Sequence, residues 1–149
     1  MNEDEKWMRI AIQEAIQAEK EDEVPVGAIL VKDGLLIAKA HNQPISKNDA
    51  TAHAEIQLIR FAGKELQNYR LNESTLFVTL EPCAMCFGAM LHARIKRIVF
   101  GAHDPKTGVF SSSQNITNTN LINNKIIVNG GVLENKCSQL LRTFFKSRR

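Results

Sequence analysis

Two short segments of the 149-residue sequence hold side chains that bind metals and move protons. His53 and Glu55 stand two residues apart, and Cys83 and Cys86 stand three residues apart. Imidazole and thiolate are preferred zinc ligands, and the spacing of the cysteines places both sulfurs on one face of a helix. Each pattern alone is weak, since a His-x-Glu arises by chance and a Cys-x-x-Cys also serves as a redox pair or as half of a structural zinc site. Their combination predicts a metal centre.

The number of available ligands indicates what kind of centre this is. His53, Cys83 and Cys86 supply three ligands, whereas tetrahedral zinc takes four, and a structural site would add another Cys or His. The remaining cysteine lies on an apolar stripe, which favours a core position; this stripe comprises Leu133, Cys137, Leu140, Leu141 and Phe144. No ligand spacing recurs at the other histidines, for which surface or packing positions are expected: His41, His92 and His103. The fourth ligand is therefore expected to be water, which indicates catalytic zinc.

Glu55 suits the chemistry of such a centre. A carboxylate beside zinc-bound water can take a proton from that water and pass it to a substrate nitrogen. The alternative role is an acid in the first helical turn that complements the helix dipole. Side chains in a first turn lean toward the helix N-terminus, so His53 and Glu55 can both reach a site there. We therefore favour the catalytic role.

Four helices are predicted to position these side chains. Apolar residues recur at three- and four-residue intervals over residues 4–20, 51–63, 82–93 and 133–145. Thr51 is a suitable N-cap, Gly63 a suitable C-terminal stop, and Pro82 a suitable first helical residue. The chemistry-bearing residues therefore lie near the N-termini of the second and third helices.

Short β-branched and apolar runs predict strands between these helices, over residues 26–31, 35–40, 75–80, 98–100 and 126–128. Asp33-Gly34 favours a tight hairpin between the first two. Residues 111–124, rich in Ser, Thr and Asn, are predicted to form a loop. Helices interleaved with strands predict a three-layer α/β/α domain around a largely mixed sheet.

The composition, 44% hydrophobic and 23% charged, is that of one soluble domain. Residues 1–23 contain eight acidic and three basic side chains, a net charge of −5, whereas residues 24–149 contain 16 basic and eight acidic ones, a net charge of +8. This asymmetry favours an anionic ligand, and we expect the acidic first helix to lie away from it. No apolar run approaches the roughly 18 residues of a membrane span, and the N-terminus lacks signal-peptide features, so we expect a cytoplasmic protein.

The paired motifs resemble the zinc-dependent nucleobase deaminase superfamily, whose signature is a His-x-Glu followed by a Pro-Cys-x-x-Cys. Further segments together resemble the bacterial tRNA-specific adenosine deaminase family; these are EVPVGA at 23–28, HNQP at 41–44, NYRL at 68–71, VTLEPC at 78–83, GAHDPKTG at 101–108 and FFKSRR at 144–149. The resemblance implies a cytidine-deaminase-like fold with a five-stranded mixed sheet, in a single deaminase domain over residues 1–149.

The resemblance also implies an activity and a set of roles. Members of this family convert the wobble adenosine of an arginine tRNA anticodon to inosine, as homodimers that carry one zinc ion per subunit. By position, His53, Cys83 and Cys86 would bind zinc, and Glu55 would shuttle protons while zinc-activated water attacks adenine C6. The expected contacts to the anticodon stem-loop are Asn42, Arg70, Asp104, Lys106, Phe145, Lys146 and Arg149.

Alternatives remain at this stage. Asn42 precedes Gln43-Pro44 and could be only a turn residue, and Arg70 could be only a solvated base. A deaminase of a free base or nucleoside, such as guanine or cytosine, would need the small pocket but no basic surface leading to it. A non-catalytic zinc module that binds RNA would need the three ligands but not Glu55.

Overall fold

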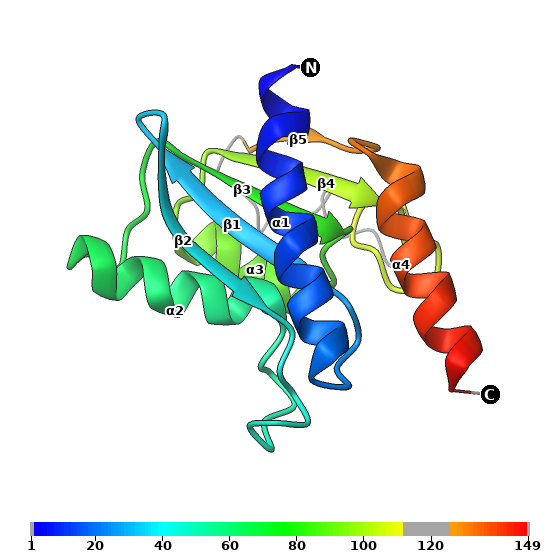
Figure 1. Cartoon of the computed structure of the whole chain (residues 1–149). Coiled ribbons are helices and arrows are strands. Elements are labelled where there is room, and N and C mark those ends of the chain that lie inside the picture. Colours follow the sequence, from blue (N-terminus) through cyan, green and yellow to red (C-terminus); the bar gives the residue numbers. More distant parts are fainter. Residues whose placement is uncertain (1, 112–125, 149) are drawn as a thin grey trace.

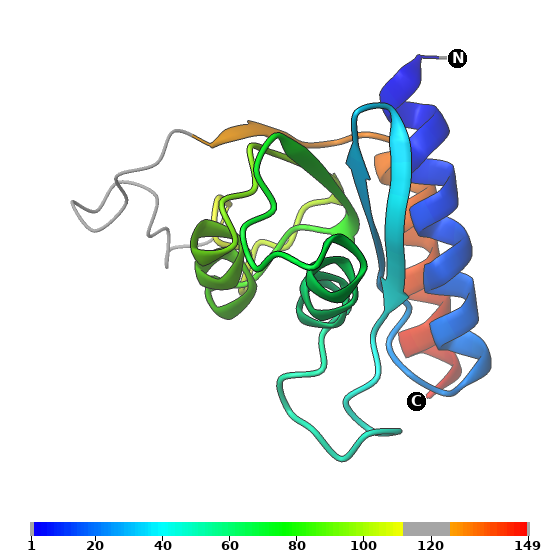
Figure 2. The same ribbon diagram turned by 90° about the vertical axis from the view of Figure 1, so that its left-hand side faces the viewer.

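A computed structural model describes residues 2–111 and 126–148 of the chain, in which a five-stranded sheet lies between two pairs of helices (Figures 1 and 2). In chain order the elements are α1 (Glu3–Lys20), β1 (Gly27–Lys32), β2 (Leu35–His41), α2 (Ala54–Leu66), β3 (Ser74–Leu80), α3 (Ala84–His92), β4 (Arg97–Ala102), β5 (Ile127–Asn129) and α4 (Glu134–Ser147). Helices α1 and α4 cover one face of the sheet, and α2 and α3 cover the other. The predicted three-layer α/β/α fold is confirmed.

The direction of the strands determines which loops meet. The strand order is β2-β1-β3-β4-β5, with β1 antiparallel to both of its neighbours and β3, β4 and β5 parallel to one another. Strands β2, β3 and β4 therefore all end at the edge of the sheet where β1 begins. Asp33 and Gly34 join β1 to β2 with positive φ angles of 53° and 73°, which confirms the predicted hairpin turn.

The central strand β3 is buried on both sides, as its apolar sequence predicted. Leu76 and Val78 pack in the core beneath α2 and α3, and Phe77 between them packs in the core beneath α1 and α4. Cys137 is 1% exposed in this second core, so its predicted core position is confirmed. None of the helices in the described part of the chain has the length and hydrophobicity needed to span a bilayer.

Three predicted helix boundaries are wrong, each for a local reason. Thr51 is not an N-cap, because its amide and hydroxyl donate to Asp49, at 2.9 and 2.7 Å, in a turn that precedes α2. Gly63 does not stop α2, which continues to Leu66 and ends before a left-handed Gln67. Pro82 lies outside α3, which begins at Ala84 after an extended Cys83.

Gly27 lets helix α1 lie directly against strand β1. A β-carbon at this position would overlap the backbone of α1 at Ala11 and Ala15. Backbone cannot move aside as the tip of a side chain can, so the helix and the strand would have to separate. The first residue of β1 therefore determines how closely α1 packs.

We predict that Gly27→Ala lowers the free energy of unfolding by roughly 2–3 kcal/mol, because it forces this overlap. Gly63→Ala is the matched control, since its β-carbon meets only Asn68 O at 3.6 Å within a helix, where alanine is favoured. Urea unfolding of the zinc-loaded proteins at equal concentration measures both. Equal stability of the two variants would contradict the close packing of α1 on β1.

Candidate active site

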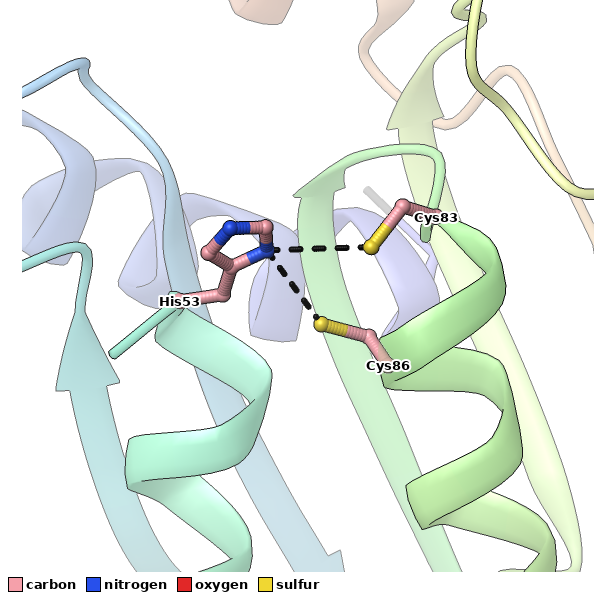
Figure 3. Close-up of side chains that lie close together, drawn as sticks. All are labelled: His53, Cys83 and Cys86. Carbon is pink, nitrogen blue, oxygen red and sulfur yellow. Dashed lines mark hydrogen bonds between the residues drawn. The ribbon is translucent and has the colours of Figure 1, made fainter. Parts of the chain in front are cut away.

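The three predicted metal ligands meet where two helices begin. His53 is the N-cap residue of α2 and Cys83 that of α3, and Cys86 lies in the first turn of α3. His53 Nδ1 lies 3.7 Å from the sulfur of Cys83 and 3.5 Å from that of Cys86 (Figure 3). Because β2 and β3 end at the same edge of the sheet, the segments that follow them bring the imidazole and the thiols together.

The donor set fits one zinc ion. Tetrahedral zinc about 2.0 Å from a nitrogen and about 2.3 Å from a sulfur separates those two atoms by about 3.5 Å. The distances from His53 to the two cysteines agree with this value, and the three ligand atoms all lie within 4.8 Å of one another. Within residues 2–111 and 126–148, this is the one group of three or more such side chains that could hold a metal.

A hydrogen bond links the two cysteine side chains and shifts their pKa values in opposite directions. A hydrogen bond from the Cys86 thiol lowers the pKa of Cys83 to about 4. The same bond, together with burial, raises the pKa of Cys86. The positive ends of two helix dipoles also favour negative charge at this point. The site is therefore suited to a divalent cation, which would displace the remaining thiol proton.

Glu55 lies in the first turn of α2, beside the cluster. Its side chain is 4% exposed, and this burial raises its pKa to about 7. A carboxyl group with such a pKa can both accept and release a proton near neutral pH. It shares a pocket of about 180 Å³ with two of the ligands; the lining comprises Val24, Val26, Asn42, His53, Glu55, Leu80, Glu81, Cys83, Asp104 and Thr107.

Asn42 and Asp104 line this pocket on two loops. The backbone N–H of Asn42 donates to Val26 O at 3.0 Å, while the side-chain amide of Asn42 has no hydrogen-bond partner among the described residues. The Asp104 carboxylate instead accepts bonds within its own turn, from the amides of Lys106 and Thr107 and from the Thr107 hydroxyl. Partial burial would raise the pKa of Asp104, but these bonds outweigh it and lower the pKa.

A second pocket, of about 420 Å³, adjoins the first and shares four lining residues with it: Val24, Leu80, Asp104 and Thr107. Lys106 and Phe145 line this second pocket, and the ring of Phe145 is 48% exposed. The exposed Lys146 follows Phe145 on α4 but lines neither pocket. The structure therefore places four of the expected RNA-contacting residues around two adjoining pockets.

The structure does not place the last two expected contacts at these pockets. Arg70 is exposed beyond the C-terminal end of α2, whose 13 residues span about 20 Å from the site at the N-terminus. It therefore lies away from the pockets of its own chain, with its guanidinium over the Tyr69 ring. Arg149 lies outside the described residues.

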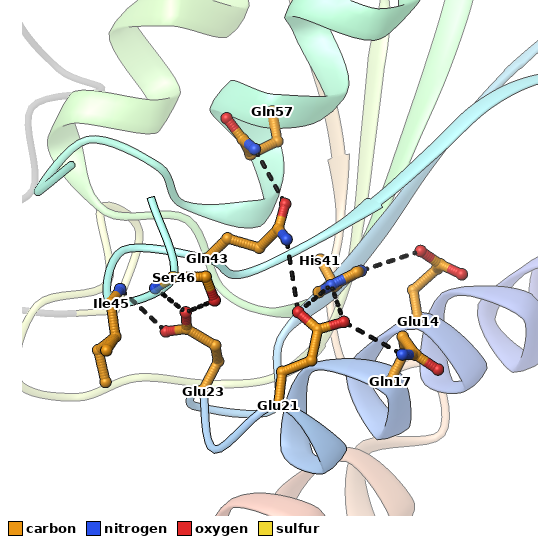
Figure 4. Close-up of polar contacts among 9 residues, drawn as sticks. All are labelled: Glu14, Gln17, Glu21, Glu23, His41, Gln43, Ile45, Ser46 and Gln57. Atoms are coloured by element: carbon orange, nitrogen blue, oxygen red, sulfur yellow. Dashed lines mark hydrogen bonds and ion pairs between the residues drawn. The ribbon is translucent and has the colours of Figure 1, made fainter. Parts of the chain in front are cut away.

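Sequence reasoning missed a group of polar contacts that hold the segment between β2 and α2. His41, for which a surface or packing position was expected, lies between Glu14 and Glu21 (Figure 4). Its Nδ1 is 3.4 Å from Glu14 Oε1, and its Nε2 is 3.0 Å from Glu21 Oε1. Gln43 donates to Glu21 and accepts from Gln57, which links this segment to α2. Hydrogen bonds from Gln17 and His41 lower the pKa of Glu21.

Glu23 holds the same segment at a second point. Its buried carboxylate accepts from the Ile45 and Ser46 amides, at 3.2 and 2.7 Å, and from the Ser46 hydroxyl (Figure 4). Burial alone would raise the pKa of Glu23, but these bonds outweigh it and lower the pKa. Helix α1 lies on the face of the sheet opposite α2 and α3 (Figure 2), and Glu23, just after α1, holds the segment that leads into α2. Glu23 ends an acidic run, and in the sequence it was distinguished only by its place in the EVPVGA segment at 23–28.

Comparisons with known proteins agree with this geometry. The sequence profile of the cytidine and deoxycytidylate deaminase zinc-binding region matches residues 1–102. A tRNA-specific adenosine deaminase of Haemophilus influenzae is 52% identical over 147 residues, which cover 98% of this chain and 85% of that protein.

Solved structures extend the similarity to the fold. A structure from a study of A-to-I editing by tRNA:A34 deaminases has a TM-score of 0.88 at 42% identity, over 91% of this chain and 99% of that one. A guanine deaminase of Nitrosomonas europaea has a TM-score of 0.81 at 25% identity, over 94% of this chain and 83% of that one. Since the profile match spans more than half of the sequence and the similarity to the bacterial relatives nearly all of it, the chain belongs to the tRNA-specific adenosine deaminase family and is a zinc-dependent deaminase.

Proposed function

We propose that this protein deaminates adenosine to inosine at the wobble position of a tRNA anticodon, with arginine tRNA as its substrate. The observation that carries the chemistry is the placement of the buried Glu55 in one small pocket with two ligands of a three-ligand metal cluster. The names of the relatives support tRNA as the substrate, and the study of the tRNA:A34 deaminases supports the wobble position.

The side chains divide the reaction between them. We assign His53, Cys83 and Cys86 as the ligands of one zinc ion per subunit, which when bound supplies an activated water as the nucleophile. Glu55, with a pKa of about 7, takes a proton from the water and delivers it to adenine N1. Addition of water at C6 and loss of ammonia then leave inosine. Asn42, from the pocket wall, hydrogen-bonds the base or its ribose.

The adjoining pocket suits the nucleotides that flank the reacting base. A wobble base must leave the stack to enter a pocket of about 180 Å³, so its neighbours are drawn against the surface around it. Phe145 offers a partly exposed ring for stacking, and Lys106 offers a positive charge at the same pocket. We assign Asp104, Lys146, Arg149 and Arg70 as further contacts to the anticodon stem-loop.

We further propose that the single deaminase domain acts as a homodimer in the cytoplasm. Large apolar side chains are exposed at Phe61 on α2 and Met85 on α3, where a second copy could cover them. Arg70 lies away from the pockets of its own chain, and in a dimer we assign it to the RNA bound at the site of the other subunit.

We predict that the wild-type enzyme converts an anticodon stem-loop with adenosine at the wobble position and leaves free guanine, cytosine and adenosine unchanged. Glu55→Gln should retain one zinc per chain and lose about 100-fold or more in rate, because an amide cannot shuttle the proton. Chromatography of the products and metal analysis measure both effects. Turnover of a free base but not of the RNA would contradict the proposed substrate, and full activity of Glu55→Gln would contradict the assigned proton transfer.

A second prediction concerns the metal. Cys83→Ala should lower the zinc content well below one per chain, because two ligands hold zinc far more weakly than three. Cys137→Ala is the matched control, since that thiol lies in the other core and should leave the zinc content unchanged. Elemental analysis after dialysis against a mild chelator measures both. Equal zinc content in the two variants would contradict the assignment of Cys83.

A third prediction concerns charge at the second pocket. Lys106→Ala, made in the Glu55→Gln background to prevent turnover, should weaken stem-loop binding and reduce the slope of log K against log salt by about 0.7, the value for one single-strand phosphate contact. Lys96→Ala removes the same charge next to β4 at the opposite edge of the sheet and should change neither quantity. Fluorescence anisotropy across a salt series measures both. An unchanged slope for Lys106→Ala would mean that this lysine does not contact phosphate.

A further inference from the structure

Glu81 is a buried carboxylate with no role in the chemistry described above. It lies between the end of β3 and the zinc ligand Cys83, and it is 3% exposed. A buried carboxylate is costly unless it is paired or hydrogen-bonded. In the described part of the chain no cation lies within ion-pair distance of Glu81, so its charge is balanced by hydrogen bonds alone.

The donors of these hydrogen bonds all belong to one loop. Glu81 Oε1 accepts from the Asp104 amide at 2.8 Å, and Oε2 accepts from the amides of Phe110 and Ser111 at 2.8 and 2.7 Å. Bonds from neutral donors to a charged acceptor are stronger than bonds between neutral groups. The carboxylate therefore holds both ends of residues 104–111, the segment that turns beside the pocket.

The loop is shaped around this carboxylate. A β-carbon on Gly108 would overlap both the Glu81 carboxyl group and Asp104 O, so only glycine lets the chain pass this closely. Backbone bonds run alongside, from Glu81 N to Ala102 O at 2.8 Å and from Val109 N to Pro82 O at 2.9 Å. Backbone hydrogen bonds on both sides of Glu81 thus support its contact with the loop.

This contact connects the two sides of the pocket. Asp104 and Thr107, on the loop, line the pocket together with His53 and Cys83, and Lys106 lines the adjoining one. Glu81 stands two residues before Cys83, so it holds the loop at a fixed place relative to α3. We propose that Glu81 is a positioning residue, whose carboxylate holds the 104–111 loop in the arrangement that receives the substrate. This inference rests on the proposed function for the identity of the substrate.

The test is the kinetic behaviour of Glu81→Gln in the zinc-loaded, full-length enzyme on the wobble-adenosine stem-loop. Glutamine keeps the shape but turns an N–H₂ group toward the loop amides, which then lose an acceptor. KM should rise about tenfold or more, while kcat and the zinc content stay close to wild type. Charge alone predicts the opposite, because removal of a negative charge beside a polyanion lowers KM.

Glu73→Gln is the matched control. It makes the same chemical change in an exposed carboxylate that pairs with Lys96, just before the other end of β3, and should leave KM unchanged. A wild-type KM for Glu81→Gln would overturn the proposal. So would a fall of about 100-fold or more in kcat at constant KM, because that result would make Glu81 a proton-transfer group.

Amide hydrogen exchange provides a test that needs no RNA. In the zinc-loaded wild-type enzyme, the amides of Phe110 and Ser111 should exchange about 100-fold or more slowly than in an unfolded chain. Glutamine keeps only one of the two acceptor oxygens, so in Glu81→Gln at least one of the Asp104, Phe110 and Ser111 amides should lose its protection while the amides of β3 keep theirs. If the variant does not fold, the wild-type measurement decides, and unprotected amides there overturn the proposal. Failure of the wild-type enzyme to deaminate the stem-loop would count against the proposed function but would leave the loop protection measurable.

Discussion

The active site depends on the directions in which the strands of the central sheet run. Because β1 runs against both β2 and β3, and β4 runs with β3, three strands deliver their C-terminal segments to one edge, and β1 begins there. Two of those segments lead into helices that lie side by side on the same face, so the N-termini of α2 and α3 meet. An imidazole from one and two thiols from the other then lie within 4.8 Å of one another. Reversal of β2 or β3 would carry the ligands that follow that strand to the far edge.

The meeting of two helix N-termini also determines the chemistry. A hydrogen bond from Cys86 lowers the pKa of Cys83 to about 4, and the partial positive charges of both dipoles also favour a thiolate at this point. Glu55 experiences the opposite influence, because its burial raises its pKa to about 7. Two acidic groups a short distance apart are thus held in different protonation states, one suited to ligation of a metal and the other to proton transfer.

Buried carboxylates organise the loops around the pocket, and they form no ion pair with any residue that the structure describes. Glu23 binds backbone amides of the segment before α2, and Glu81 binds those of the loop after β4. Both carboxylates accept hydrogen bonds from backbone N–H groups, and these bonds hold the loops in place. Lys106, on the same loop as the amides that bind Glu81, is exposed and lines the adjoining pocket, where its charge is available to the polyanion proposed as substrate.

Much of the fold and the central chemistry could be predicted from the sequence. Apolar patterns indicated, in the right order, the nine elements found in the described residues, and Asp33-Gly34 indicated the hairpin, because these patterns depend on local backbone preferences and on burial of one face. The His-x-Glu and Cys-x-x-Cys spacings indicated the metal centre, since coordination chemistry restricts which residue types can serve.

Helix ends were less predictable: the Asp49 side chain competes for Thr51, and α2 continues past Gly63 to Leu66, which packs against the core. Only the tertiary structure showed that Arg70 lies about a helix length from its own pocket, and that Glu23 and Glu81 hold the loops. The contacts of Glu23 and Glu81 join different segments through backbone amides. Nearly every residue carries such an amide, so these contacts leave no pattern of residue types in the sequence.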